Sequence, residues 1–214
     1  MQNLPALFIA DAPALDFLNS VATPVDAAVD WLDDGEGLLR WLHQSRLVTD
    51  PALEQMRSRF SRADLDKAAE KARDLREWFR EFVQRYRGRP LSRDSFKKLE
   101  RLNLVLERDA SFTQIAPAPA KGGNVFELKA LRHRRTPEAL LLPIAEILAR
   151  FVCDEDFADV KACEGPTCTL LFADHTRGRV RRWCSMAICG NRAKQAAHRQ
   201  RVRADRPRRE VPED

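Results

Sequence analysis

Four of the five cysteines in this sequence form two pairs of identical spacing. The pairs are Cys163 with Cys168 and Cys184 with Cys189; four residues separate the members of each pair, and 15 residues separate the pairs. Thiolates suit Zn²⁺, which takes four ligands in a tetrahedron when it holds a fold together. Two short loops that each bring two sulfurs to one ion satisfy this geometry, so the pattern predicts one structural zinc ion per chain. A closed set of four thiolates leaves no position for water, which argues against zinc catalysis.

Spacing alone leaves other uses of these residues open. Two disulfides or buried unligated thiols would employ the same cysteines, although a reducing cytosol favours metal. His175 and His198 lie near the pairs and would offer other ligand sets, but their polar and basic surroundings favour a surface or phosphate-facing position. Cys153 ends an apolar stretch and is predicted to be a core thiol.

The basic charge of the chain is concentrated around the second cysteine pair. The net charge is +5 overall, yet residues 177–209 hold twelve basic residues and one acid, Asp205, for a net charge of +11. Residues 1–176 carry a net charge of −3. A basic segment on a mildly acidic body predicts a polyanionic partner, most often nucleic acid. The predicted nucleic-acid contacts are Arg177, Arg179, Arg181, Arg182, Asn191, Arg192, Lys194, Gln195, Arg199, Arg201 and Arg203.

These contacts divide into a connection and a helix. The first four arginines lie between the cysteine pairs and are predicted to contact phosphates, which gives affinity without sequence information. Residues 185–204 have a helix-forming composition, and on a helix Arg192, Arg199 and Arg203 share one face. The helix is predicted to enter a major groove, where Arg, Asn and Gln pair with bases. Because Asn191 and Arg192 adjoin a cysteine, bracing of the zinc module is an equal alternative for them, and phosphate contact is favoured for the last three arginines.

RNA is the alternative partner. Basic zinc modules also bind single strands, usually through aromatic stacking. After Phe172 only Trp183 remains as an aromatic residue, which favours duplex DNA. A module of about 45 residues has too little core to hold itself, so zinc is predicted to fix its fold. Phe172 and Trp183 are predicted to pack beside the metal and to form what apolar core there is. A stacking platform for a nucleotide is the alternative role of Trp183.

The elements that position these residues are predicted to be mainly helical. The 214 residues are 44% hydrophobic, which suffices for one ordinary domain and a small one. Residues 1–155 are predicted to form a helical domain with a small β-hairpin. Residues 156–205 are predicted to form the zinc module, with short strands and the basic helix, and residues 206–214 a disordered tail.

Apolar periodicity and turn residues locate the individual elements. The helical domain is predicted to begin with a short buried element at 15–21, helices at 26–32 and 36–48, and a long helix from Ser61 to Tyr86. A helix from Ser92 is predicted to bury Phe96, Leu99, Leu102 and Leu106. It is followed by a predicted hairpin of strands 111–115 and 124–131 and by a helix from Thr136 through Phe151. Two short strands at 160–163 and 168–172 are predicted around the first cysteine pair.

Three polar residues stand in apolar stretches of the helical domain. Asp16, Asn19 and Arg76 are predicted to line a pocket for a small-molecule effector. The alternative roles are a helix cap, a local hydrogen bond and a surface arginine, respectively. Dimerisation is the other predicted role of this domain, because a homodimer suits two-fold DNA sites.

Enzymes and membrane proteins are disfavoured. The sequence has no Gly-rich phosphate loop, no His-Glu-x-x-His and no Gly-x-Ser-x-Gly, so no catalytic activity is expected. No apolar run reaches the roughly 18–20 residues of a membrane-spanning helix. Residues 1–5 lack the basic start of a signal peptide. We therefore expect a cytoplasmic, nucleoid-associated protein with no membrane partner.

Residues 181–194, which contain Cys189-Gly190-Asn191-Arg192, closely resemble the CGNR zinc-finger family of bacterial proteins. The resemblance covers about residues 160–203. Members of this family usually carry an N-terminal helical domain named ABATE and are described as stress-induced transcription regulators. Residues 15–20 and 75–77 are similar to parts of that domain, although Ser20 stands where Thr is more frequent. The resemblance implies zinc binding by the four paired cysteines, DNA binding and a role in transcription regulation.

Overall fold

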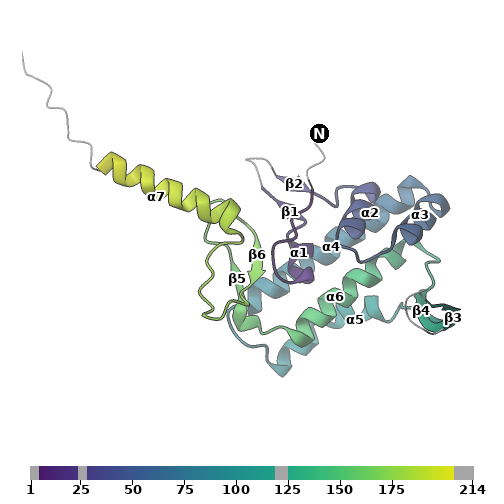
Figure 1. Cartoon of the computed structure of the whole chain (residues 1–214). Helices are drawn as coiled ribbons and strands as arrows, with labels where there is room; N and C mark the ends of the chain where they lie inside the picture. Colours follow the sequence, from purple (N-terminus) through teal and green to yellow (C-terminus); the bar gives the residue numbers. More distant parts are fainter. Residues whose placement is uncertain (1–4, 24–27, 119–124, 205–214) are drawn as a thin grey trace, which may run out of the picture.

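The computed structural model is mainly helical, as predicted, and contains three two-stranded sheets (Figure 1). It describes residues 5–23, 28–118 and 125–204, with side chains up to residue 201. The predicted tail at 206–214 lies outside the described residues. None of the helices in these ranges combines the length and apolar character needed to cross a membrane.

Helix α4 (Arg62–Tyr86) runs through the centre of the helical domain. The Ser61 hydroxyl accepts a hydrogen bond from the Asp64 amide at 3.2 Å and caps the helix. The apolar stripe from Leu65 to Val83 is buried, because its members recur every three or four residues. The predicted long helix is confirmed.

Helices α1 (Pro13–Leu18), α2 (Gly35–Gln44) and α6 (Leu141–Asp154) pack against α4. A Cβ on Gly35 would lie 2.5 Å from the Leu65 Cβ, so only glycine permits α2 to begin this close to α4. Helices were predicted at the places of α2 and α6, and a short buried element at the place of α1. Helix α6 is preceded by the 3₁₀ helix η2 (Pro137–Leu140).

The predicted helix at 26–32 is wrong. Strand β2 (Val29–Asp30) pairs antiparallel with β1 (Val21–Ala22), while residues 24–27 lie outside the described part of the chain. The reason lies in α4: Arg76 donates to both carboxylate oxygens of Asp30, at 2.8 and 2.7 Å. One turn earlier on α4, Arg73 donates to the carbonyl oxygens of residues 32 and 33. These bonds hold the segment in an extended form that its own sequence does not reveal.

Two further predictions for the helical domain need correction. A 3₁₀ helix, η1 (Arg93–Lys98), precedes α5 (Glu100–Leu106), and Phe96 is 66% exposed rather than buried. Cys153 is exposed, because it lies two positions from the buried Phe151 and therefore on another side of α6. Helix α3 (Asp50–Arg59) was not predicted, since it buries only Leu53 and Met56.

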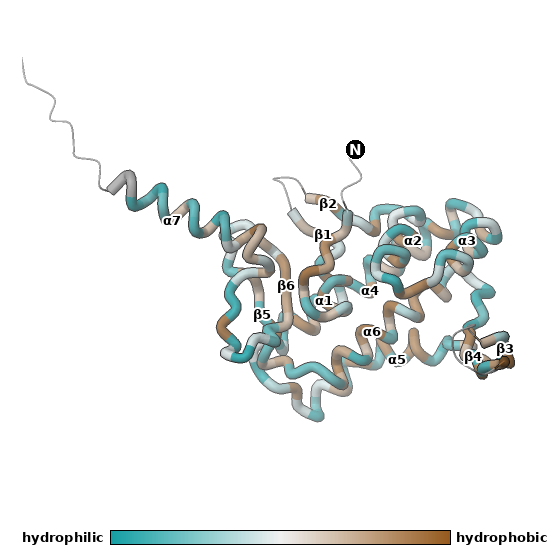
Figure 2. Tube along the Cα trace, in the orientation of Figure 1, coloured by the Kyte–Doolittle hydropathy of each residue, from teal (hydrophilic) through white to brown (hydrophobic). Residues whose placement is uncertain are grey.

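The predicted hairpin is present at the end of the molecule away from α7 (Figure 1). Strands β3 (Ser111–Pro117) and β4 (Phe126–Arg132) pair antiparallel with Ile115 opposite Leu128. Ile115, Phe126 and Leu128 are between 65% and 75% exposed, and Figure 2 shows strongly hydrophobic residues along this hairpin.

The C-terminal module begins with η3 (Phe157–Asp159) and a small sheet. Strand β5 (Val160–Ala162) pairs antiparallel with β6 (Leu171–Ala173). Both predicted strands are present, but the second begins at Leu171 rather than at residue 168. A π-helical turn, η4 (Met186–Gly190), leads into α7 (Asn191–Ala204). Figure 1 shows α7 extending away from the rest of the molecule.

The module shares its core with the helical domain. The three residues of β6 are fully buried. The Asn19 amide group donates to the Leu171 carbonyl at 2.8 Å and accepts from the Leu171 amide at 3.0 Å. The Ala173 amide donates to the Ala10 carbonyl at 2.9 Å. The expectation that zinc fixes a module with too little core is therefore incomplete, because the helical domain supplies much of that core.

Candidate metal centre

The four paired cysteines meet at one point. Their sulfur atoms all lie within 4.8 Å of one another. The Cys184 sulfur lies 3.8 Å from that of Cys168 and 3.6 Å from that of Cys189. A tetrahedron with zinc–sulfur bonds of about 2.3 Å has edges of about 3.8 Å. The separations therefore fit one zinc ion and exceed the roughly 2.05 Å of a disulfide.

Backbone geometry sets each sulfur in place. Cys163 follows β5, and its sulfur accepts from the amides of Cys184 at 3.3 Å and Gly165 at 3.4 Å. A Cβ on Gly165 would lie 3.1 Å from the Cys189 sulfur, so the first loop passes very close to the second pair. In the second pair, Cys184 lies just before η4 and Cys189 lies within it, which confirms the helical turn expected there.

The sulfur cluster is electrostatically suited to a divalent cation. Hydrogen bonding to the Cys168 sulfur, together with burial, raises the pKa of the Cys184 thiol far above its ordinary value. Burial raises the pKa of Cys189 to about 12, whereas the hydrogen bond with Cys184 lowers the pKa of Cys168 to about 5. Four sulfurs this close cannot all ionise without a compensating cation. These residues fit one structural Zn²⁺, with neither His175 nor His198 in the cluster.

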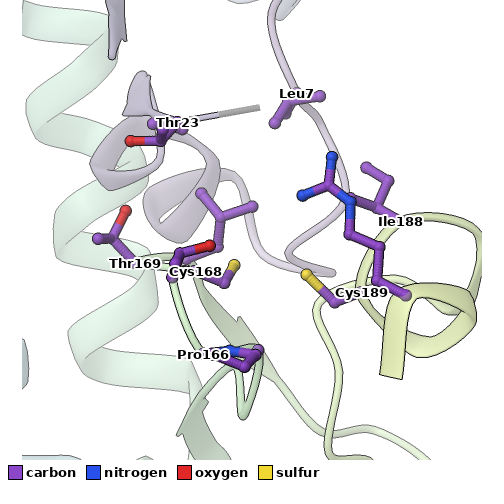
Figure 3. A pocket seen from close by; sticks show the side chains of 12 residues that line it. Leu7, Thr23, Pro166, Cys168, Thr169, Ile188 and Cys189 are labelled. Carbon is purple, nitrogen blue, oxygen red and sulfur yellow. The ribbon is translucent and has the colours of Figure 1, made fainter. Parts of the chain in front are cut away.

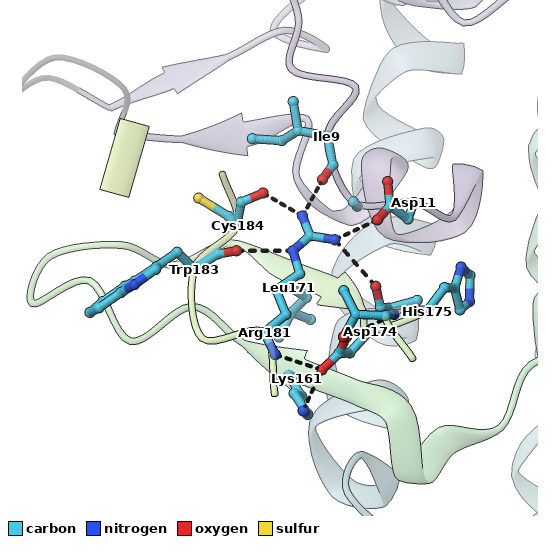
Figure 4. A network of polar contacts seen from close by, with 12 residues as sticks. Ile9, Asp11, Lys161, Leu171, Asp174, His175, Arg181, Trp183 and Cys184 are labelled. Atoms are coloured by element: carbon cyan, nitrogen blue, oxygen red, sulfur yellow. Dashed lines mark hydrogen bonds and ion pairs between the residues drawn. The ribbon is translucent and has the colours of Figure 1, made fainter. Parts of the chain in front are cut away.

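Arg181 joins the metal centre to the N-terminal segment (Figure 4). Its guanidinium donates to the carbonyl oxygens of Trp183 and Cys184 on one side. On the other side it donates to the Ile9 carbonyl at 2.9 Å and pairs with the Asp11 carboxylate. The side chain is only 18% exposed. The prediction that Arg181 contacts phosphate is therefore wrong, because protein acceptors already occupy its donors.

Asp174 organises the connection between the cysteine pairs. It is fully buried and accepts from the Lys161 ammonium at 2.6 Å, the Arg181 amide at 2.9 Å and the Thr176 hydroxyl at 2.6 Å. Burial alone would raise its pKa, but these donors hold the pKa of the Asp174 carboxyl well below its usual range. The sequence signal for this role was a lone acid directly after an apolar strand.

The two aromatic residues contribute to the apolar core, as predicted. Phe172 is fully buried under the Arg181 guanidinium, whose carbon lies 4.3 Å from the ring centroid. Trp183 is half-buried against the core, and Arg182 lies over its ring at 5.1 Å. The core and Arg182 therefore already cover part of the indole, which weakens the alternative of a nucleotide-stacking platform.

The other arginines of the connection remain accessible. Arg177 is exposed. Arg179 pairs with Asp159 at 3.1 Å and Arg182 with Glu164 at 2.6 Å, in ion pairs whose arginines are 49% and 63% exposed. Exposed ion pairs are weak, so these guanidinium groups can exchange a carboxylate for a phosphate.

Helix α7 presents the remaining predicted contacts. The side chains of Asn191, Arg192, Lys194, Gln195, Arg199 and Arg201 are exposed. The Arg203 side chain lies outside the described residues. Arg192 and Leu7 also line a small cavity beside the sulfurs, and Figure 3 shows the Cys168 and Cys189 sulfurs facing each other at this cavity. Arg192 is thus placed for bracing the module as well as for an outside contact.

The three candidate effector ligands do not form a pocket. Asp16 accepts from the amides of Ile9 at 2.9 Å and Ala10 at 3.0 Å, and burial raises its pKa to about 6. Asn19 holds β6, and Arg76, which is only 3% exposed, holds β2. Each residue fixes a different segment, so the prediction of a shared ligand pocket is wrong. Arg76 is not the surface arginine of the alternative either.

Comparison with known families agrees with this architecture. Residues 11–155 match the family model ABATE, described as "Putative stress-induced transcription regulator". Residues 160–202 match the CGNR zinc finger.

The chain belongs to the ABATE family. Its zinc finger is of the CGNR type, which confirms the resemblance seen in the sequence. No curated protein matches the chain. In this ABATE protein the metal ligands come from the zinc finger, while the N-terminal segment supplies Asp11 and the Ile9 carbonyl to the arginine that supports them.

Proposed function

We propose that this protein regulates transcription by binding duplex DNA through its zinc finger and α7. One observation carries the proposal: no acidic residue lies between Asp174 and Asp205, and the basic side chains in this stretch are exposed apart from Arg181 and the undescribed Arg203. Because α7 extends away from the helical domain, a duplex can approach it without meeting the acidic body (Figure 1). Neutralising phosphates with such a surface provides most of the affinity for nucleic acid.

The residues divide into phosphate contacts and base contacts. Arg177, Arg179 and Arg182 on the connection are proposed to bind phosphates. Helix α7 has 14 residues, or about 21 Å at 1.5 Å per residue, and suits a major groove about 12 Å wide. Within it, Asn191 and Gln195 are proposed to read bases. The arginines at 192, 199, 201 and 203 add charge.

The ABATE domain is proposed to carry regulation rather than catalysis. A conformational change caused by an effector in this domain can be transmitted to the finger through the hydrogen bonds of Asn19 and Arg181, which connect the domain and the finger directly. A homodimer would match two-fold DNA sites, and sedimentation of the zinc-loaded protein tests for it. We place the protein in the cytoplasm, at the nucleoid.

The test is fluorescence anisotropy with full-length, zinc-loaded protein and genomic duplex fragments at two salt concentrations. Replacing Arg199 and Arg201 with Gln is expected to reduce the slope of log affinity against log salt by about 2. Arg57→Gln, at an exposed position of the helical domain, is the matched control and should leave the slope unchanged. Gln195→Ala should weaken the binding of the preferred fragments more than the binding of the other fragments.

Other outcomes point elsewhere. Equal affinity for every fragment, lost at high salt, would contradict base reading while leaving a phosphate-binding surface. Tighter binding of single-stranded RNA would favour the alternative partner. No binding to any nucleic acid by the zinc-loaded protein would contradict the proposal.

A further inference from the structure

A second cavity lies on the ABATE domain, and none of its lining residues belongs to the finger. Its volume is about 160 Å³, and it opens between α4, α5, the base of the hairpin and η2. Val105, Leu141 and Leu142 form an apolar floor. An engineered apolar cavity of about 150 Å³ holds one benzene molecule, so this space suits a ligand body of similar size.

The rim of this cavity is cationic. Lys71, Arg108 and Arg135 line it together with one acid, Glu138, which pairs with Lys71 at 2.6 Å. No ion pair joins Arg108 or Arg135 to another residue within the described ranges. Two guanidinium groups are therefore left to face an anion at the mouth of an apolar space.

The surroundings add to this positive charge. Arg134, next to the rim, has a pKa lowered first by burial and then by the positive charge of Arg132. Arg132 itself is neutralised by Asp109 at 3.0 Å and Glu146 at 2.7 Å. A bound anion would relieve the repulsion that remains around the cavity.

We infer that this cavity binds a small organic carboxylate with an aromatic or branched hydrocarbon body. The hydrocarbon would occupy the apolar floor, and the carboxylate would accept hydrogen bonds from Arg108 and Arg135. Arginine matches a carboxylate well, because its fork of N–H donors can engage both oxygens. A neutral ligand of the same shape, such as the matching amide, could still accept a hydrogen bond but would bring no negative charge to the two guanidinium groups.

The cavity also lies where a ligand can influence the fold. Ala110 enters the hairpin and His133 leaves it; the His133 amide closes the base by donating to the Ala110 carbonyl at 3.1 Å. The His133 ring stacks on Phe112 with centroids 4.2 Å apart. A ligand would contact Ala110 and His133 at the base of the hairpin and the helices that line the cavity. Its role as an effector rests on the proposed function, but its binding does not.

Isothermal titration of the full-length, zinc-loaded protein tests the inference without DNA. The probes are benzoate, phenylacetate and 4-methylpentanoate, with benzamide as the neutral match of benzoate and inorganic phosphate as an anion without hydrocarbon. We expect saturable binding of at least one carboxylate, and at least tenfold weaker binding of benzamide and phosphate. Arg108→Gln and Arg135→Gln should each weaken the binding of that carboxylate about tenfold, as expected when a charge-assisted hydrogen bond is lost.

Arg93→Gln, at an exposed position of η1, is the control and should bind like the unmodified protein. Leu142→Phe, which fills the floor, should also weaken binding, and circular dichroism checks that each variant is folded. Absence of saturable binding by all three carboxylates at millimolar concentration would overturn the inference. So would unchanged affinity in both arginine variants, or phosphate binding as tight as that of the best carboxylate. DNA binding measured in parallel separates failure of this site from failure of the proposed function.

Discussion

Asp16 is a buried carboxyl group near the N-terminus whose protonation affects stability. Burial raises its pKa to about 6 from an ordinary value of 3.8, even though two backbone amides donate to it. Since the folded pKa is the higher one, the folded state binds the proton more tightly than the unfolded state. The stability that this proton provides is complete below about pH 4 and is lost as the pH rises through 6.

Asp16→Asn is therefore expected to stabilise the protein at alkaline pH. The amide oxygen can still accept from Ile9 and Ala10, but no charge is buried. Urea unfolding should show a gain of about 1–2 kcal/mol at pH 8 that disappears near pH 4. Asp16→Ala, which leaves two amides without an acceptor, should lose stability at both pH values. A loss of stability in the Asn variant at pH 8 would contradict the view that ionised Asp16 is unfavourable.

At the scale of elements, the crossing of α2 and α4 depends on Gly35. A methyl group there would lie 2.5 Å from the Leu65 Cβ and 2.7 Å from the Leu65 carbonyl carbon, and the backbone cannot move aside cheaply. Gly35→Ala should lower the free energy of unfolding by about 1–3 kcal/mol. Gly178→Ala is the matched control, because its methyl would meet only Val180 at an ordinary distance of 3.6 Å. Equal free energies of unfolding for the two variants would show that α2 and α4 can move apart without loss of stability.

Elements with a strong local pattern could be predicted from the sequence. The apolar stripe and Ser61 cap of α4, and the alternation of the hairpin, contain enough local information. The β1–β2 pair does not, because Arg76 fixes it from 46 residues away. Likewise, cysteine spacing predicted the metal ligands. Sequence alone could not show that Arg181 turns inward, since its acceptors at Ile9 and Asp11 come from the opposite end of the chain.

At the scale of the whole molecule, the zinc site and the ABATE domain should be stable or unstable together. Zinc fixes Cys184, whose carbonyl accepts from Arg181, and Arg181 also holds Ile9. Removing zinc with a strong chelator should therefore expose α1 and residues 9–12 as well as the finger. Hydrogen exchange is expected to increase in both regions, and the thermal midpoint should fall.

Two cysteine variants make this test specific. Cys184→Ser should reproduce the effect of the chelator without any chelator present. Cys153→Ser changes an exposed thiol outside the cluster and should leave exchange and the thermal midpoint unchanged. Faster exchange limited to residues 163–204 would contradict the coupling.

The pairing of Asn19 with Leu171 also affects how the protein is made. The two residues are 152 positions apart, so α1 emerges from the ribosome long before its partner strand exists. At roughly 5–20 residues per second, this interval lasts on the order of ten to thirty seconds. During that time the N-terminal segment has no β6 to lie on, and its apolar residues are open to chaperones or to neighbouring nascent chains. Helix α1 is thus synthesised long before it can reach its final place.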